Sequence, residues 1–258
     1  MTASRPPAAP ATTAVADEGP RAFGSAVDLE VDFARDDRAT LVTAVLARCA
    51  TPHDASHWWA QAVSTRTSAL LRVLAASDGE SALSLVARCG ACGESLEFEL
   101  PLAALGAAEA DYSSRPLRVT LPGRPALSLR RPTGDDLRAW RHAGWTSRPD
   151  AVRRMVDALR IAGPLPTADD EPALAAALAE QDPLVAFAVD CRCPHCDAAQ
   201  SVSVDLEGIA LSRLAARQDA LLRDVHRLAS RYGWTEAEVL AVPATRRRRY
   251  LALIEGDA

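Results

Sequence analysis

The chain has 258 residues, 48% of them hydrophobic and 24% charged, which is enough for one large domain or two small ones. Its formal net charge of −5 argues against a general nucleic-acid binder. It contains no lysine, so phosphate-binding P-loops and Schiff-base catalysis lack their essential residue. No apolar run is long enough to cross a bilayer and no signal peptide is recognisable, so we expect a cytoplasmic protein.

The pattern along the chain predicts six segments. A disordered tail rich in Ala, Pro and Thr precedes helices with apolar residues at three-to-four spacing. Two strand pairs each carry a Cys-x-x-Cys knuckle, a helical insertion separates them, and further helices follow. In order, these are the tail 1–25, the N-terminal helices 26–80, the first knuckle hairpin and strands 81–131, the helical insertion 132–183, the second knuckle hairpin 184–206 and the C-terminal helices 207–258.

Helix boundaries follow from local residues. A helix over 57–77 should end at Gly79 and the long C-terminal helix at Gly233, since glycine is favoured just after a helix. Thr133 or Asp135 can cap the helix that begins in "PTGDD", which makes this carboxylate pair a capping element rather than an acid–base pair.

The two Cys-x-x-Cys pairs are the strongest functional pattern. The copies lie 104 residues apart (193 minus 89), each between an apolar run and an alternating strand. One knuckle offers two thiolates, whereas a closed zinc site needs four ligands, so each copy is predicted to be half of one site. The predicted ligands of a structural zinc are Cys89, Cys92, Cys193 and Cys196.

Alternatives to this metal site remain at this stage. Cys191 lies two residues before Cys193 and is an alternative ligand, although the matching offsets of the copies favour Cys193. Reduced thiols without metal and a redox pair are the other interpretations. With zinc, the fold class is α+β, mainly α, with helices around a small zinc-ribbon-like β unit of two Cys-x-x-Cys hairpins.

Other candidate residues have simpler explanations. His53 and His57 are four apart, but the glutamate of the metalloprotease motif is missing and the adjacent tryptophans suggest packing. Cys49 is expected in the core. Arg246 to Arg249 would fan out around a helix over roughly 300°, so they cannot all face one nucleic-acid groove. Without a nucleophile elbow or a phosphate loop, we expect no enzyme.

The order of parts resembles a known bacterial family. The pieces "SALLRVLAASDG", "RCGACGESLEFEL", "RRPTGDDLRA", "QDPL" and "CPHC", and the ending "LLRDVHRLASRYGWTEAEVLAVPATRRRRYLALI", are similar to proteins related to the baseplate hub assembly chaperones of T-even phages. These are associated with phage-like contractile injection systems. The family's two Cys-x-x-Cys pairs match Cys89, Cys92, Cys193 and Cys196, and Asp197 stands where a knuckle often has glycine.

The resemblance implies a role in assembly. It predicts a chaperone or minor structural component that contacts baseplate hub or spike proteins, without a small-molecule substrate or a membrane. The residues Trp234, Tyr250, Leu251 and Leu253 beside the arginines suggest a docking surface, unless the aromatic rings only close a core. A zinc-ribbon adaptor acting in transcription or RNA binding is the alternative function.

Overall fold

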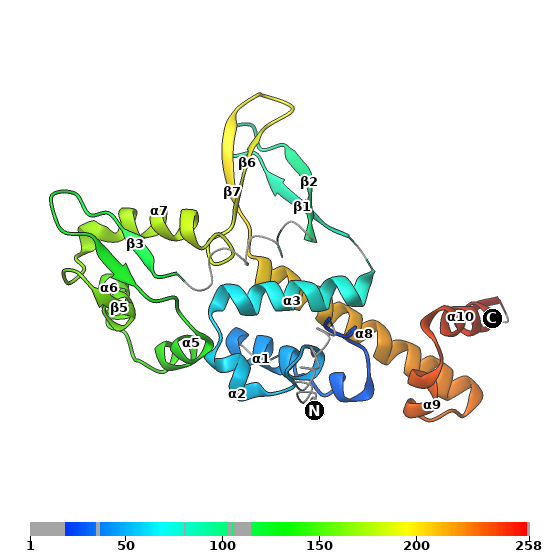
Figure 1. The fold of residues 1–258 in the computed structure, drawn as a ribbon. Helices are drawn as coiled ribbons and strands as arrows, with labels where there is room; N and C mark the ends of the chain where they lie inside the picture. The colour runs from blue at the N-terminus through cyan, green and yellow to red at the C-terminus, as the bar shows by residue number, and fades with distance from the viewer. Residues whose placement is uncertain (1–18, 35–36, 80, 103–104, 106–114, 257–258) are drawn as a thin grey trace, which may run out of the picture.

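The structure, a computed structural model, describes residues 19–34, 37–79, 81–102, 105 and 115–256. It is a mainly helical α+β protein with small antiparallel hairpins, as the sequence predicts. Figure 1 shows a central helical body from which three parts project: a pair of hairpins, an insertion lobe on one side and a C-terminal lobe at the far end of a long helix. Among the described helices, none is both long and apolar enough to span a membrane.

The central body consists of α1 (Arg38–Cys49), α2 (Ala55–Ala60), α3 (Val63–Asp78) and the first half of α8 (Leu206–Tyr232). Its core is mostly aliphatic, with Phe23 and Trp58 among buried side chains that come from all four helices, from the N-terminal segment and from the strand β1 (Ala82–Arg88). The predicted helix over 57–77 is wrong in one respect, because α2 and α3 are separate. Ala62 between them is extended and forms a bridge with Thr133, which interrupts the helix.

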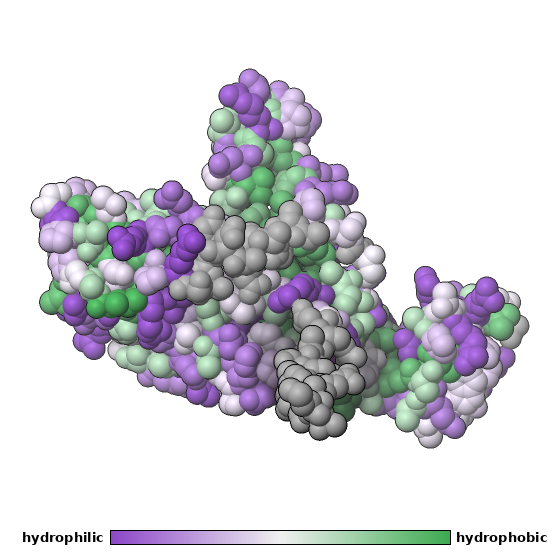
Figure 2. Space-filling model, in the orientation of Figure 1, coloured by the Kyte–Doolittle hydropathy of each residue, from purple (hydrophilic) through white to green (hydrophobic). Residues whose placement is uncertain are grey.

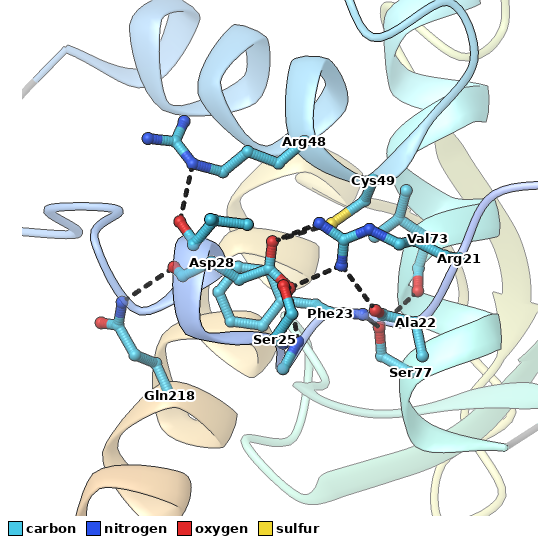
Figure 3. Close-up of polar contacts among 12 residues, drawn as sticks. Arg21, Ala22, Phe23, Ser25, Asp28, Arg48, Cys49, Val73, Ser77 and Gln218 are labelled. Carbon is cyan, nitrogen blue, oxygen red and sulfur yellow. Dashed lines mark hydrogen bonds and ion pairs between the residues drawn. The ribbon is translucent and has the colours of Figure 1, made fainter. Parts of the chain in front are cut away.

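One carboxylate holds together the N-terminal segment that packs on this body. Asp28, in the short helix η1 (Ala26–Asp28), accepts hydrogen bonds from both Arg21 guanidinium nitrogens at 2.7 Å and from the backbone N–H groups of Gly24 and Ser25 at 2.8 Å (Figure 3). Burial by itself raises its pKa, but these donors outweigh it and lower the pKa of Asp28 to about 2. The segment therefore depends on Asp28 being ionised.

This packing corrects the boundary predicted for the tail. Residues 1–18 of the predicted tail lie outside the described residues. Within residues 19–25 the Phe23 side chain is fully buried, and the Phe23 backbone N–H donates to Ser77 Oγ on α3. A single aromatic residue among Ala, Gly and Pro was too weak a pattern to reveal this contact.

The insertion lobe has its own small core. Its sheet has the order β3-β4-β5 (Leu117–Val119, Leu127–Leu129 and Arg160–Ala162), and its helices are α5 (Gly134–Arg141), α6 (Arg148–Leu159) and α7 (Glu171–Gln181), with the short helix η2 (Ala168–Asp170) before α7. Strand β5 was not predicted, because its three exposed residues lack alternation. Thr133 is the cap of α5, with Asp136 completing a capping box.

The joint between this lobe and the body is polar and buried. Arg131 and Asp182, which are 6% and 3% exposed, form an ion pair, and Arg131 also donates to the Gln181 carbonyl at 2.7 Å. Nearby, the Arg66 guanidinium lies over the Trp59 ring and donates to the Ala39 carbonyl at 2.7 Å. Three charged side chains are thus buried where the lobe meets the body.

The C-terminal lobe consists of the second half of α8, α9 (Glu236–Ala241) and α10 (Ala244–Gly256). Its core contains Leu228, Val239 and Leu251. Gly233 ends α8 with a φ of 70°, as predicted, and Thr235 caps α9. Not all large apolar side chains of α8 are buried, since Leu222 and Tyr232 are exposed. At 27 residues, α8 is about 40 Å long and carries this lobe away from the body (Figure 1).

Candidate metal centre

Two hairpins of matching design form an arm on the central body (Figure 1). The first pairs β1 with β2 (Ser95–Pro101), and the second pairs β6 (Ala188–Arg192) with β7 (Ala199–Ser203). Alternating apolar residues of both pack against the central core, among them Leu85 and its partner Phe98. In the second hairpin Val189 and its partner Val202 do the same. This packing holds the two knuckles at the same end of the arm.

The knuckle turns share the same backbone hydrogen bonds. In the first, the Cys89 N–H donates to the Glu94 carbonyl at 2.8 Å, and the Gly93 N–H donates to the Cys89 carbonyl at 2.9 Å. In the second, the Cys193 N–H donates to the Ala198 carbonyl at 3.0 Å, and the Asp197 N–H to the Cys193 carbonyl at 2.8 Å. Each turn therefore aims two sulfurs toward the other hairpin.

The four sulfurs meet in a crossed arrangement. The Sγ atoms of Cys89 and Cys196 are 3.7 Å apart, as are those of Cys92 and Cys193, so each contact joins the first cysteine of one knuckle to the second of the other. The four ligand atoms all lie within 4.8 Å of one another. In each knuckle the first cysteine is buried and the second is exposed. The arrangement has approximate two-fold symmetry.

These distances fit a tetrahedral metal ion. Zinc–thiolate bonds are about 2.3 Å long, which places the sulfurs of a regular tetrahedron about 3.8 Å apart. A disulfide would need sulfurs at about 2.05 Å, and all six cysteines are free thiols. The four-cysteine cluster can therefore hold a metal ion such as zinc, and it is the one such group of His, Cys, Asp and Glu side chains within the described residues.

The pKa values of the two thiols in the first knuckle are shifted in opposite directions. The N–H groups of Cys92 and Ala91 point at the Cys89 sulfur and lower the pKa of Cys89 to about 6. The Glu94 N–H acts in the same direction on Cys92, but loss of water and the adjacent sulfurs outweigh it and raise the pKa of Cys92 to about 12. Four thiolates this close repel one another, so a cation is needed to balance them together.

Gln200 links the hairpins beside the cluster. Its side-chain oxygen accepts from the Gly90 N–H at 3.1 Å, and its amide nitrogen donates to the Cys191 sulfur at 3.8 Å. Gln200 was not predicted from the sequence, although it lies on the inward face of β7 two residues before Val202, where an apolar residue is expected. Cys191 itself lies outside the cluster of four, and Cys193 is the member inside it.

Cys49 and the histidines discussed next lie outside the cluster of four sulfurs. Cys49 is buried in the central core, as expected, where burial and the Asp28 carboxylate raise the pKa of its thiol to about 12. His195 is exposed at the knuckle tip. The His57 ring packs edge-on against Trp58 with ring centroids 5.1 Å apart, in agreement with the packing interpretation. His53 is exposed and belongs to no cluster of metal-binding side chains among the described residues.

We compared the chain with protein families, curated proteins and solved structures. No protein-family model, no curated protein and no solved structure matches the chain.

Proposed function

We propose that Cys89, Cys92, Cys193 and Cys196 hold one structural zinc ion. The observation that supports this most strongly is the pair of crossed 3.7 Å sulfur–sulfur distances, which suit a tetrahedral ion. Four thiolates favour zinc or iron over harder metals. A bound ion would have all four positions filled by protein, as in structural sites, whereas catalytic zinc keeps one position open. Its contribution would be to cross-link the two hairpins.

For the biological role, we propose a non-enzymatic assembly factor. The chain would act as a chaperone or minor structural component for the baseplate hub of a phage tail or phage-like contractile injection system, in contact with hub or spike proteins. Support comes from the sequence resemblance, which covers most of the chain after the tail. The architecture is compatible with this role, because three projecting parts around one helical body offer separate surfaces (Figure 1).

Metal analysis tests the first proposal. Protein purified without chelators should contain about one zinc per chain, measured by elemental analysis and by intact mass under native conditions. Cys191→Ser should keep the metal and Cys196→Ser should lose it. A preparation with six titratable thiols and no metal would contradict the site, and bound iron in place of zinc would contradict the identity of the ion.

Co-expression with the neighbouring tail proteins of the same genome tests the second. A hub or spike protein should co-purify with the intact chain, and the complex should survive moderate salt. If no tail protein is recovered and nucleic acid co-purifies in a salt-sensitive way, the assembly role is wrong and the zinc-ribbon adaptor in transcription or RNA binding is favoured. The metal result is independent of this outcome.

A further inference from the structure

The helix α10 presents an unusual exposed face. At 100° per residue, Arg246, Arg249, Tyr250 and Leu253 fall within an arc of about 100°. This arc borders the side that packs into the lobe, where Leu251 is buried. Leu253 is 60% exposed, and both arginines are exposed. The exposed Leu253 side chain thus lies between the exposed side chains of Arg246 and Arg249.

An aromatic group extends this face onto the end of α8. Tyr232 stacks on Trp234 with ring centroids 5.0 Å apart, and Tyr250 lies edge-on to both at 5.8 Å and 5.1 Å. Trp234 and Tyr250 are half-buried over the lobe core, but Tyr232 is 39% exposed. We call Tyr232, Arg246, Arg249, Tyr250 and Leu253 together the α10 face.

The charge of this lobe is opposite to that of the whole chain. Residues 221–256 contain seven arginines against four acidic residues, a net charge of +3, whereas the chain carries −5. Some of these arginines have internal roles: Arg227 pairs with Glu255 at 2.9 Å, and buried Arg247 reaches the carbonyl of Leu240 at 3.4 Å. Arg246 and Arg249 have no carboxylate within 4 Å among the described residues.

We propose that the α10 face binds an acidic segment of a partner protein that also supplies an apolar side chain. Tyrosine and arginine are the residue types that anchor protein interfaces, and Leu253 offers an apolar contact between the cations. The surplus of positive charge on the lobe favours a negatively charged partner. In Figure 2 the lobe shows hydrophilic and hydrophobic side chains next to one another, as a mixed interface requires.

Two other occupants fit less well. Nucleic-acid bases stack on exposed aromatic rings, but of these three rings only Tyr232 is exposed, and one face of it already stacks on Trp234. A second copy of this chain, joined through its acidic remainder, would make a head-to-tail contact, which propagates into a ring or an open filament. An acidic partner segment requires neither an exposed ring for base stacking nor self-assembly of the chain. This inference holds whether or not the partner belongs to a contractile tail.

A peptide selection tests the proposal on the full-length, metal-loaded chain. Random 15-residue peptides are selected on the immobilised protein, and the affinities of the enriched peptides are measured by fluorescence anisotropy. We expect acidic peptides with an aromatic or leucine residue, with at least tenfold weaker binding to the double variant Arg246→Glu/Arg249→Glu. The control is Arg248→Glu on the exposed opposite side of α10, which is compared with the single variants Arg246→Glu and Arg249→Glu because each of the three makes the same charge change.

Each other outcome overturns the inference. Failure to enrich peptides, enrichment without acidic residues, or equal weakening by the control would each reject it. If a thymidine oligonucleotide binds the chain and no peptide does, the α10 face is assigned to nucleic acid. If the chain self-associates with increasing concentration and the double variant does not, the face is assigned to a second copy. Circular dichroism melting of each variant separates loss of binding from loss of fold. Because no tail protein is used, the result is independent of the co-expression experiment.

Discussion

Asp197 holds the same left-handed backbone conformation as Gly93, with φ values of 56° and 78°. Each residue follows the second cysteine of its knuckle, and each donates its N–H to the carbonyl of the first. Residues with a side chain pay about 1–2 kcal/mol for this conformation, although aspartate adopts it more readily than most. The departure from glycine at Asp197 therefore leaves the turn geometry intact.

Gly93→Ala should destabilise the first knuckle. We expect a loss of about 1 kcal/mol in the free energy of unfolding, measured by urea denaturation of the metal-loaded protein. Gly90→Ala is the matched control, because neither glycine has an atom within 4 Å of an added methyl group and only Gly93 has a positive φ. Equal effects of the two variants would show that backbone conformation does not limit this turn.

Loss of one predicted ligand should affect the whole fold. Cys196→Ser should lower the melting temperature by about 10 °C or more, because the metal that joins two distant hairpins is lost. Cys191→Ser, where a serine oxygen can still accept from Gln200, should change it by less than about 3 °C. Melting is followed by circular dichroism with and without a chelator. A chelator that leaves the wild-type curve unchanged would argue against a structural metal.

Asp28 should make the protein acid-sensitive. Its pKa is lowered to about 2 from an ordinary 3.8, so its contribution is fully present above about pH 4 and is lost as the pH falls toward 2. The loss should amount to about 2 kcal/mol. Asp28→Asn should remove this part of the pH dependence, measured by urea denaturation between pH 2 and 6, and the exposed Asp32→Asn should retain it. Parallel curves for the wild type and Asp28→Asn would contradict the assignment.

Gly134 is required by a buried arginine. An added methyl group at this position would overlap the Arg66 guanidinium and lie 2.9 Å from the Trp59 carbonyl oxygen. Gly134→Ala should therefore cost about 2–3 kcal/mol in denaturant unfolding. Combining it with Arg66→Met should cost less than the sum of the single changes, with a coupling of at least about 0.5 kcal/mol. Strict additivity would mean that the two residues do not compete for space.

Much of the fold could be predicted from local patterns. Duplicated cysteine spacing with period-two alternation predicted both hairpins, and Leu96, Phe98 and Leu100 do lie on the inward face of β2. Glycine marked the ends of α3 and α8 because those positions need a positive φ. The sequence pattern also predicted that the four cysteines meet, since each knuckle presents only two of the four ligands that a closed metal site needs.

The remaining features depend on contacts between distant residues. The break between α2 and α3 arises from a bridge with Thr133, about seventy residues later, and β5 exists only because β4 lies beside it. Tertiary packing gives the consecutive arginines 246–249 different environments, since Arg247 is buried and the other three are exposed. Trp234, Tyr250 and Leu251 do close a core, whereas Leu253 is exposed, and the docking surface stays a prediction.

The distance between the knuckles along the chain also bears on biosynthesis. A ribosome extends a chain by roughly 5–20 residues per second, so Cys193 is added roughly 5–20 s after Cys89. During that interval the nascent chain offers two of its four thiolates, while the entire insertion lobe is being made. A polypeptide released before residue 196 can never complete the cluster. The four-cysteine cluster can therefore form only in chains that extend at least to residue 196, and a metal bound there would join the hairpins only in those chains.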